Sequence, residues 1–244
     1  MDNLINGLIN MLKYDHLLTV STYTRTVLIL VTVLIGVTLL LIFISYKLLP
    51  LIDFGTYYSI VSCILLVIAS VMALLIAFAK KINEKYPLNV SLAIIYSICV
   101  ATAIGFWNLD VPITIHFGAF AIDLAIFTFA LLIGASIETN LMDSFKVLLF
   151  ILLVISAIII TVMVVIYYLH SDDAVVLGLF ICAEILLFIM TIFFSHFTVG
   201  KSRYRLFYPN YTLAALLLYI MFSTALPITD DLFRIIMNNW NVTK

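Results

Sequence analysis

The sequence predicts an all-α, polytopic membrane protein with seven transmembrane helices in one bundle. Three observations predict this fold class. The 244 residues are 65% hydrophobic and only 10% charged, whereas a soluble domain is about half apolar and a quarter charged. Seven apolar segments each approach the ~20 residues that a helix needs to cross a bilayer. Apart from Lys47, the basic residues between these segments fall on alternate connections.

The chain is expected to divide into three parts. Residues 1–26 form a cytosolic N-terminal segment, residues 27–237 the seven-helix bundle, and residues 238–244 a short tail. In the first part, Leu, Ile and Met recur at helical spacing. That pattern fits an amphipathic helix lying on the membrane surface, and it fits a loosely ordered terminus equally well.

Short connections between the apolar segments make consecutive helices antiparallel neighbours. The expected spans are Val27–Leu49, Tyr58–Phe78, Leu88–Trp107, Ile113–Ala135, Val147–Leu169, Ala174–Phe197 and Tyr211–Ile228. The seventh is expected to be short or re-entrant, because Pro227 and the pair Asp230 and Asp231 interrupt its apolar run.

Positive charge predicts the orientation. Lys and Arg precede the first span and lie in the connections after the second, fourth and sixth spans. Because basic loops remain on the cytosolic side, the N-terminus is expected to be cytosolic. With seven spans the C-terminus then lies on the opposite side.

Small residues mark one face of the third segment. Ala93, Ser97, Ala101 and Gly105 follow one another at four-residue intervals. Such a stripe lets a neighbouring helix approach closely, so we interpret it as a packing surface.

Two acids lie near the centres of apolar segments. Asp123 is near the middle of the fourth segment and Glu184 near the middle of the sixth. A carboxylate in hydrocarbon costs a few kcal/mol, so such residues usually face a bundle interior or a water path. Two carboxylates placed together can share a proton or bind a cation. They are candidate cation or proton sites, and the alternative for each is a hydrogen-bonded structural acid.

The polar residues around these acids follow one face of each segment. His116 lies seven residues before Asp123 and is read first as a satisfied polar group near the interface, and second as part of the site. Ala119, Ala130 and Gly134 share its face. Glu184 shares a face with Thr191, Ser195 and Thr198.

Other function classes are disfavoured. The net charge of −1 argues against a nucleic-acid partner. None of the hydrolase, metalloprotease or nucleotide-binding motifs is present, so an enzyme is not expected. No cofactor is predicted beyond Ca²⁺ or H⁺ as a permeant or regulatory ion, and no metal site is assigned.

Three stretches carry a family resemblance. They are Lys85–Asn89 (KYPLN), Gly118–Phe127 (GAFAIDLAIF) and Tyr211–Tyr219 (YTLAALLLY), with motif positions Pro87, Asn89, Ala119, Phe120, Tyr211 and Tyr219. In order and interval they resemble the transmembrane Bax inhibitor motif family, which includes the Lifeguard and Golgi anti-apoptotic proteins. The likeness extends from about residue 25 to the end of the chain, and it implies a divergent member of that family.

The resemblance implies a helical bundle in the endoplasmic reticulum, the Golgi or a bacterial plasma membrane. It also implies a pH-sensitive calcium leak and suppression of cell death, attributed in the family to two aspartates. The corresponding positions here are Phe194 and Met221, so that acidic pair is missing. Any conduction would rely on Glu184 and Asp123 instead.

Three functional hypotheses follow. The first is a regulator of cell death and intracellular calcium, with a pH-sensitive cation leak. The second is a non-conducting membrane scaffold that binds other proteins. The third is a small receptor-like or transporter-like protein. The expected partners are the lipid bilayer and membrane proteins of the cell-death machinery, and the oligomeric state stays open.

Overall fold

The structure is a computed structural model of the 244-residue chain. It describes residues 2–48, 57–79, 87–107, 112–137, 173–199 and 210–242, together with single positions between 154 and 165. All regular structure in these ranges is helical, as the sequence predicts. The helices are α1 (Asp2–Leu48), α2 (Tyr58–Phe78), α4 (Leu88–Trp107), α5 (Ile113–Ser136), α7 (Asp173–Thr198) and α8 (Tyr211–Val242).

Five helices in the described ranges are long and apolar enough to cross a membrane. Their candidate spans are Thr22–Lys47, Leu88–Phe106, Ile113–Ser136, Val176–Thr198 and Tyr211–Met237. Helix α2 adds a shorter apolar run, Ile60–Ile76. The chain is therefore a helical, multipass membrane protein. The expected fifth span, Val147–Leu169, lies outside the described ranges, so seven spans stay a prediction.

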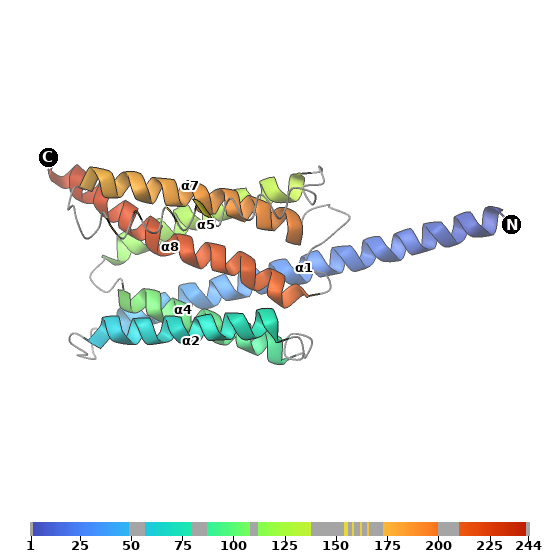
Figure 1. The fold of residues 1–244 in the computed structure, drawn as a ribbon, viewed down its shortest axis with the longest axis horizontal. Coiled ribbons are helices and arrows are strands. Elements are labelled where there is room, and N and C mark those ends of the chain that lie inside the picture. The colour runs from blue at the N-terminus through green and yellow to red at the C-terminus, as the bar shows by residue number, and fades with distance from the viewer. Residues whose placement is uncertain are drawn as a thin grey trace.

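Helix α1 joins the predicted N-terminal segment to the first span. It is continuous from Asp2 to Leu48, so the boundary expected at residue 26 lies inside a helix. Its 47 residues correspond to ~70 Å of helix, about twice the hydrocarbon thickness of a bilayer. The N-terminal part of α1 accordingly extends beyond the other helices (Figure 1).

Helix α8 lies at the centre of the arrangement. It contacts α5 and α7 on one side and α1, α2 and α4 on the other (Figure 1). Its inward residues are fully buried, among them Leu218, Tyr219 and Phe222. Phe222 packs edge-on against Phe120 and Phe127 of α5, with ring centroids 5.5 Å apart in both pairs. The last helix in the sequence therefore joins the two halves of the bundle.

The expected interruption of the last span is wrong. Helix α8 continues through Pro227 and both following aspartates to Val242, with no re-entrant turn. A proline removes one backbone donor, here the one that would bond the carbonyl of Ser223. Membrane helices tolerate this loss where neighbouring helices and hydroxyl side chains satisfy the backbone. Asp230 is fully buried rather than marking a helix end.

The small-residue stripe of α4 faces the bundle, as predicted. Ala93, Ser97 and Ala101 have no exposed surface. A side chain added at Gly105 would lie 2.9 Å from the β-carbon of Ser45 in α1. The stripe therefore sets a close approach of α1 and α4.

Candidate functional site: an acidic cluster between three helices

Polar side chains from three helices meet in the otherwise apolar interior. We call this set the acidic cluster. Its members are His116 and Asp123 of α5, Glu184 of α7, and Thr229 and Asp230 of α8.

One face of α5 carries the first part of the cluster. His116 and Asp123 are 4% and 1% exposed. Ala119, Ala130 and Gly134, which share their face, are buried as well. This confirms the prediction that the polar and small-residue stripe of this helix points inward. The small residues matter because they let α7 approach: a β-carbon at Gly134 would lie 2.3 Å from the carbonyl oxygen of Ile192.

Asp123 and Glu184 line the same small cavity between α5, α7 and α8. Its volume is about 10 Å³, roughly the space that a single water molecule needs. The Asp123 carboxyl is close enough to interact electrostatically with Glu184 and Asp230. The remaining lining is largely apolar and includes Phe127, Met221 and Phe222. The two acids that the sequence singled out are therefore brought together.

Helix α8 supplies a hydrogen-bond donor to Glu184. The Thr229 hydroxyl donates to Glu184 Oε1 over 2.7 Å. A second acceptor, the carbonyl of Ala225, lies 3.2 Å from the same hydroxyl oxygen. Because a hydroxyl has one proton, the shorter contact to the carboxylate is the stronger. This hydrogen bond connects Glu184 of α7 to α8.

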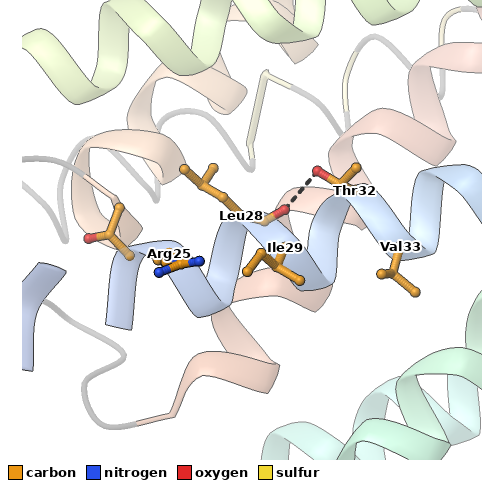
Figure 2. A pocket seen from close by; sticks show the side chains of 6 residues that line it. Arg25, Leu28, Ile29, Thr32 and Val33 are labelled. Carbon is orange, nitrogen blue, oxygen red and sulfur yellow. Dashed lines mark hydrogen bonds between the residues drawn. The ribbon is translucent and has the colours of Figure 1, made fainter. Parts of the chain in front are cut away.

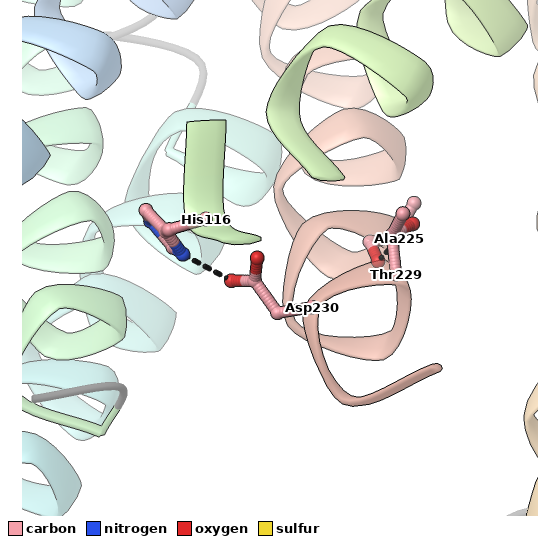
Figure 3. Close-up of polar contacts among 4 residues, drawn as sticks. All are labelled: His116, Ala225, Thr229 and Asp230. Carbon is pink, nitrogen blue, oxygen red and sulfur yellow. Dashed lines mark hydrogen bonds and ion pairs between the residues drawn. The ribbon is translucent and has the colours of Figure 1, made fainter. Parts of the chain in front are cut away.

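His116 pairs with Asp230 across α5 and α8. Its Nδ1 lies 2.6 Å from Asp230 Oδ2, and both side chains are buried (Figure 3). A buried polar pair is costly to break, because the remaining partner keeps its desolvation penalty. The sequence placed His116 near an interface as a satisfied polar group, and the structure gives it an acidic partner.

Asp123 contributes an unpartnered carboxyl oxygen to the cluster. Within the described ranges, its Oδ2 is buried and has no hydrogen-bond partner. A buried carboxyl oxygen without a donor is costly as an anion. Asp123 also lines the cavity that it shares with Glu184.

Sequence reasoning missed Thr229 and Asp230. It assigned Asp230 to an interruption because a proline and a neighbouring acid lie nearby. A signal was available: Leu226, Phe222 and Tyr219 precede Asp230 by four, eight and eleven residues, which is one helical face. All three are fully buried.

The described part of the chain offers few ligands for a metal. No group of three or more His, Cys, Asp or Glu side chains is placed to hold one. Asp123 and Glu184 are the residues that would bind a cation in the cavity, with Thr191 as a third oxygen source. Thr191 already donates its hydroxyl proton to the carbonyl of Leu187, 2.8 Å away.

The positions singled out by the family resemblance lie in several places. Met221 lines the cavity of the acidic cluster, and Phe194 is buried in the apolar core. Ala119 and Phe120 are buried beside Asp123. Among the other motif positions, the Asn89 Oδ1 accepts a hydrogen bond from the Val90 amide, and Pro87 immediately precedes α4. Tyr211 begins α8, and Tyr219 lies within it.

Tyr219 belongs to a second polar group, which we call the hydroxyl cluster. Its hydroxyl oxygen lies 2.5 Å from Thr38 Oγ1 of α1 and 3.1 Å from Ser97 Oγ of α4. Ser97 also bonds the carbonyl of Leu34 over 3.0 Å. All three hydroxyl side chains are fully buried. No sequence pattern predicts that these three hydroxyls meet.

A groove on α1 is separate from both clusters. It has a volume of about 620 Å³ and follows one face of α1, lined by Thr24, Arg25, Leu28, Ile29, Thr32 and Val33 (Figure 2). Its described lining is mostly apolar, with one cation at one end. It offers no acid or nucleophile, so we do not place chemistry there.

Comparison with known proteins leaves the family open. The chain matches no protein-family model, and no curated protein is significantly similar to it.

Proposed function

We propose that this multipass membrane protein binds a proton or a cation at the acidic cluster inside its bundle. The observation that carries the proposal is the shared cavity of Asp123 and Glu184. Acids within membrane helices are rare and usually mark ion pathways or proton relays. Here two of them meet at one cavity, and a third helix contributes Thr229 and Asp230.

The resemblance to the Bax inhibitor motif family supports a particular version of this function. We propose a divergent member that modulates intracellular calcium and cell death through a pH-sensitive cation leak. Met221, where the resemblance would place the second aspartate, borders the same cavity as Asp123 and Glu184. The acids would then occupy other positions around one common site.

The cellular setting follows the same resemblance. We propose the endoplasmic reticulum or Golgi, or a bacterial plasma membrane, with a cytosolic N-terminus. Membrane proteins of the cell-death machinery are the proposed partners.

A non-conducting interaction protein is the second candidate. The observation that favours it is the small cavity, which at about 10 Å³ leaves no room for a hydrated ion. In this version the acidic cluster holds three helices in place, and the protein acts by binding other membrane proteins.

Ion flux in liposomes tests the proposal. The full chain is reconstituted, and proton and Ca²⁺ entry are recorded with trapped fluorescent indicators across a range of pH. We expect a pH-dependent flux that falls about tenfold or more in Asp123→Asn and Glu184→Gln, since a tenfold effect needs only ~1.4 kcal/mol. Thr128→Val is the matched control, because this side chain is exposed on α5, bonds the carbonyl of Leu124 and does not line the cavity. Flux that is absent, or equal in all variants, would favour the scaffold.

A further inference from the structure

We propose that the groove on α1 binds an anionic phospholipid, with the phosphate at Arg25 and an acyl chain along Leu28, Ile29 and Val33. This site is separate from the acidic cluster, and the proposal does not depend on ion binding there. Three observations carry it. They are the depth of Arg25 in the membrane, the apolar lining beyond it, and the charge of its guanidinium group.

Arg25 lies at the boundary between the lipid headgroups and the hydrocarbon. The first candidate span is Thr22–Lys47, and within it only Arg25 and Lys47 carry a charge. The 22 residues between these two cations (47 minus 25) correspond to ~33 Å of helix, close to the ~30 Å thickness of the hydrocarbon core. The guanidinium group is therefore at the depth of the lipid phosphates.

Beyond Arg25 the groove continues into the hydrocarbon. Leu28, Ile29 and Val33 line it and are 36%, 54% and 44% exposed. They follow Arg25 by three to eight residues, which places them ~5–12 Å deeper along the helix. Thr32 donates its hydroxyl proton to the carbonyl of Leu28, 2.9 Å away, so its polar group is satisfied within α1 (Figure 2). This part of the groove suits a hydrocarbon chain.

The guanidinium group of Arg25 is free to bind an anion. Its side chain is exposed at one end of the groove (Figure 2). Within the described ranges, no Asp or Glu forms an ion pair with it. A guanidinium group presents its donors as a planar fork that matches the oxygens of a phosphate. A phospholipid would supply that phosphate at the depth where Arg25 lies.

Charge and volume select the class of lipid. A zwitterionic lipid brings its own cation beside the phosphate, whereas an anionic lipid keeps a net negative charge to pair with Arg25. One cation near the membrane surface strengthens binding to anionic lipid about fivefold. By the positive-inside rule Arg25 is expected in the cytosolic leaflet, which contains anionic lipids. The groove, at about 620 Å³, lies within the ~300–1,000 Å³ that ligand sites span.

A second groove in the same leaflet provides an internal control. It has a volume of about 370 Å³, lies between α2, α4 and α8, and has no charged residue in its described lining, which includes Leu217. Helices α1 and α8 enter the bundle from the same side (Figure 1). Val33 lies five residues before Thr38, and Leu217 lies two residues before Tyr219. Because Thr38 and Tyr219 contact each other, Val33 and Leu217 are at similar depths.

Fluorescence quenching by brominated lipids tests the proposal. Trp107→Phe and Trp240→Phe remove both native tryptophans, and Val33→Trp or Leu217→Trp then places a single reporter in one groove. The full chain is reconstituted in mixtures of phosphatidylcholine and phosphatidylglycerol, with bromine on the acyl chains of one of them. The quenching gives the relative affinity of the two lipids at each tryptophan. Both leaflets have the same composition, so the orientation of the chain does not affect the result.

We expect phosphatidylglycerol to be preferred about fivefold or more at Val33→Trp, with no preference at Leu217→Trp. Arg25→Gln should abolish the preference at Val33→Trp, because it removes the cation, whereas Arg25→Lys should retain it. Lys47→Gln is the matched control, since it removes an exposed cation from the other end of the same span and does not line the groove. Circular dichroism confirms that each variant is folded.

Three results would overturn the inference. They are equal affinity for the two lipids at Val33→Trp, a preference that persists in Arg25→Gln or appears equally at Leu217→Trp, and the absence of quenching by either lipid at Val33→Trp. The last result would mean that a protein segment occupies the groove. Because the assay measures lipid contact and not flux, its outcome is independent of the function proposed for the acidic cluster.

Discussion

At the scale of single residues, the interior of this bundle separates charged from uncharged polar groups. The acidic cluster joins α5, α7 and α8, and the hydroxyl cluster joins α1, α4 and α8. Apart from the half-buried Glu184, the members of both clusters are buried, so they depend on their neighbours for hydrogen-bond partners.

A double-mutant cycle should show that His116 and Asp230 act as a pair. His116→Asn and Asp230→Asn each leave a buried partner without its contact, so each is expected to lower the free energy of unfolding by ~1–3 kcal/mol. Together they should cost less than the sum of the single changes, with a coupling of ~0.5–3 kcal/mol. Unfolding in mixed micelles measures both.

Thr128→Val combined with His116→Asn is the control for that cycle. Thr128 is exposed and bonds the carbonyl of Leu124 within α5, so its change should add to that of His116 without coupling. Strict additivity in the first cycle would contradict the pairing that Figure 3 shows.

At the scale of helices, close packing between α5 and α7 holds the cavity walls in place. A β-carbon at Gly134 would lie 2.3 Å from a backbone oxygen of α7, and a backbone atom cannot move aside as a flexible side chain can. Gly134→Ala is therefore expected to destabilise the protein by ~1–3 kcal/mol, as overpacking does. Loss of thermal stability in detergent is the measurement.

Gly178→Ala provides the matched control for this prediction. Gly178 lies in α7, and a β-carbon there would meet nothing within 4 Å. Since alanine favours helix more than glycine, Gly178→Ala should be neutral or slightly stabilising. Equal losses in the two variants would show that the close crossing is not what holds the helices.

The helical class and the inward faces of α4 and α5 could be predicted from the sequence. A carboxylate that faces lipid is costly, so an isolated acid on an apolar helix is expected to face the bundle interior. Asp123 is indeed only 1% exposed. The sequence pattern could not show which helices contact one another. Asp123 and Glu184 are 61 residues apart (184 minus 123), and helical periodicity says nothing about which faces pair.

The main wrong prediction was the interruption of the last span, and the reason is physical. Pro227, Asp230 and Asp231 reduce the apolar character of one short stretch. Local composition treats them as a break, whereas in the folded bundle Asp230 pairs with His116 of another helix. Because His116 pairs with Asp230, the helix continues past this residue to Val242.

At the scale of the whole molecule, the predicted topology is testable. If all seven segments span, the N- and C-termini lie on opposite faces of the membrane. Single cysteines placed at each end, in a background without Cys63, Cys99 and Cys182, should react with an impermeant thiol reagent from opposite sides. Labelling of both ends from the same side would require an even number of spans.

The central position of α8 has a consequence for biosynthesis. The ribosome makes α8 after the helices that it contacts, and these are both α5 and α7 and the group of α1, α2 and α4. Until residues 211–242 enter the membrane, those two groups lack the surface that joins them. A chain truncated before Tyr211 would therefore expose Asp123 and Ser97 to lipid, and the cell's membrane quality-control machinery should recognise and degrade it.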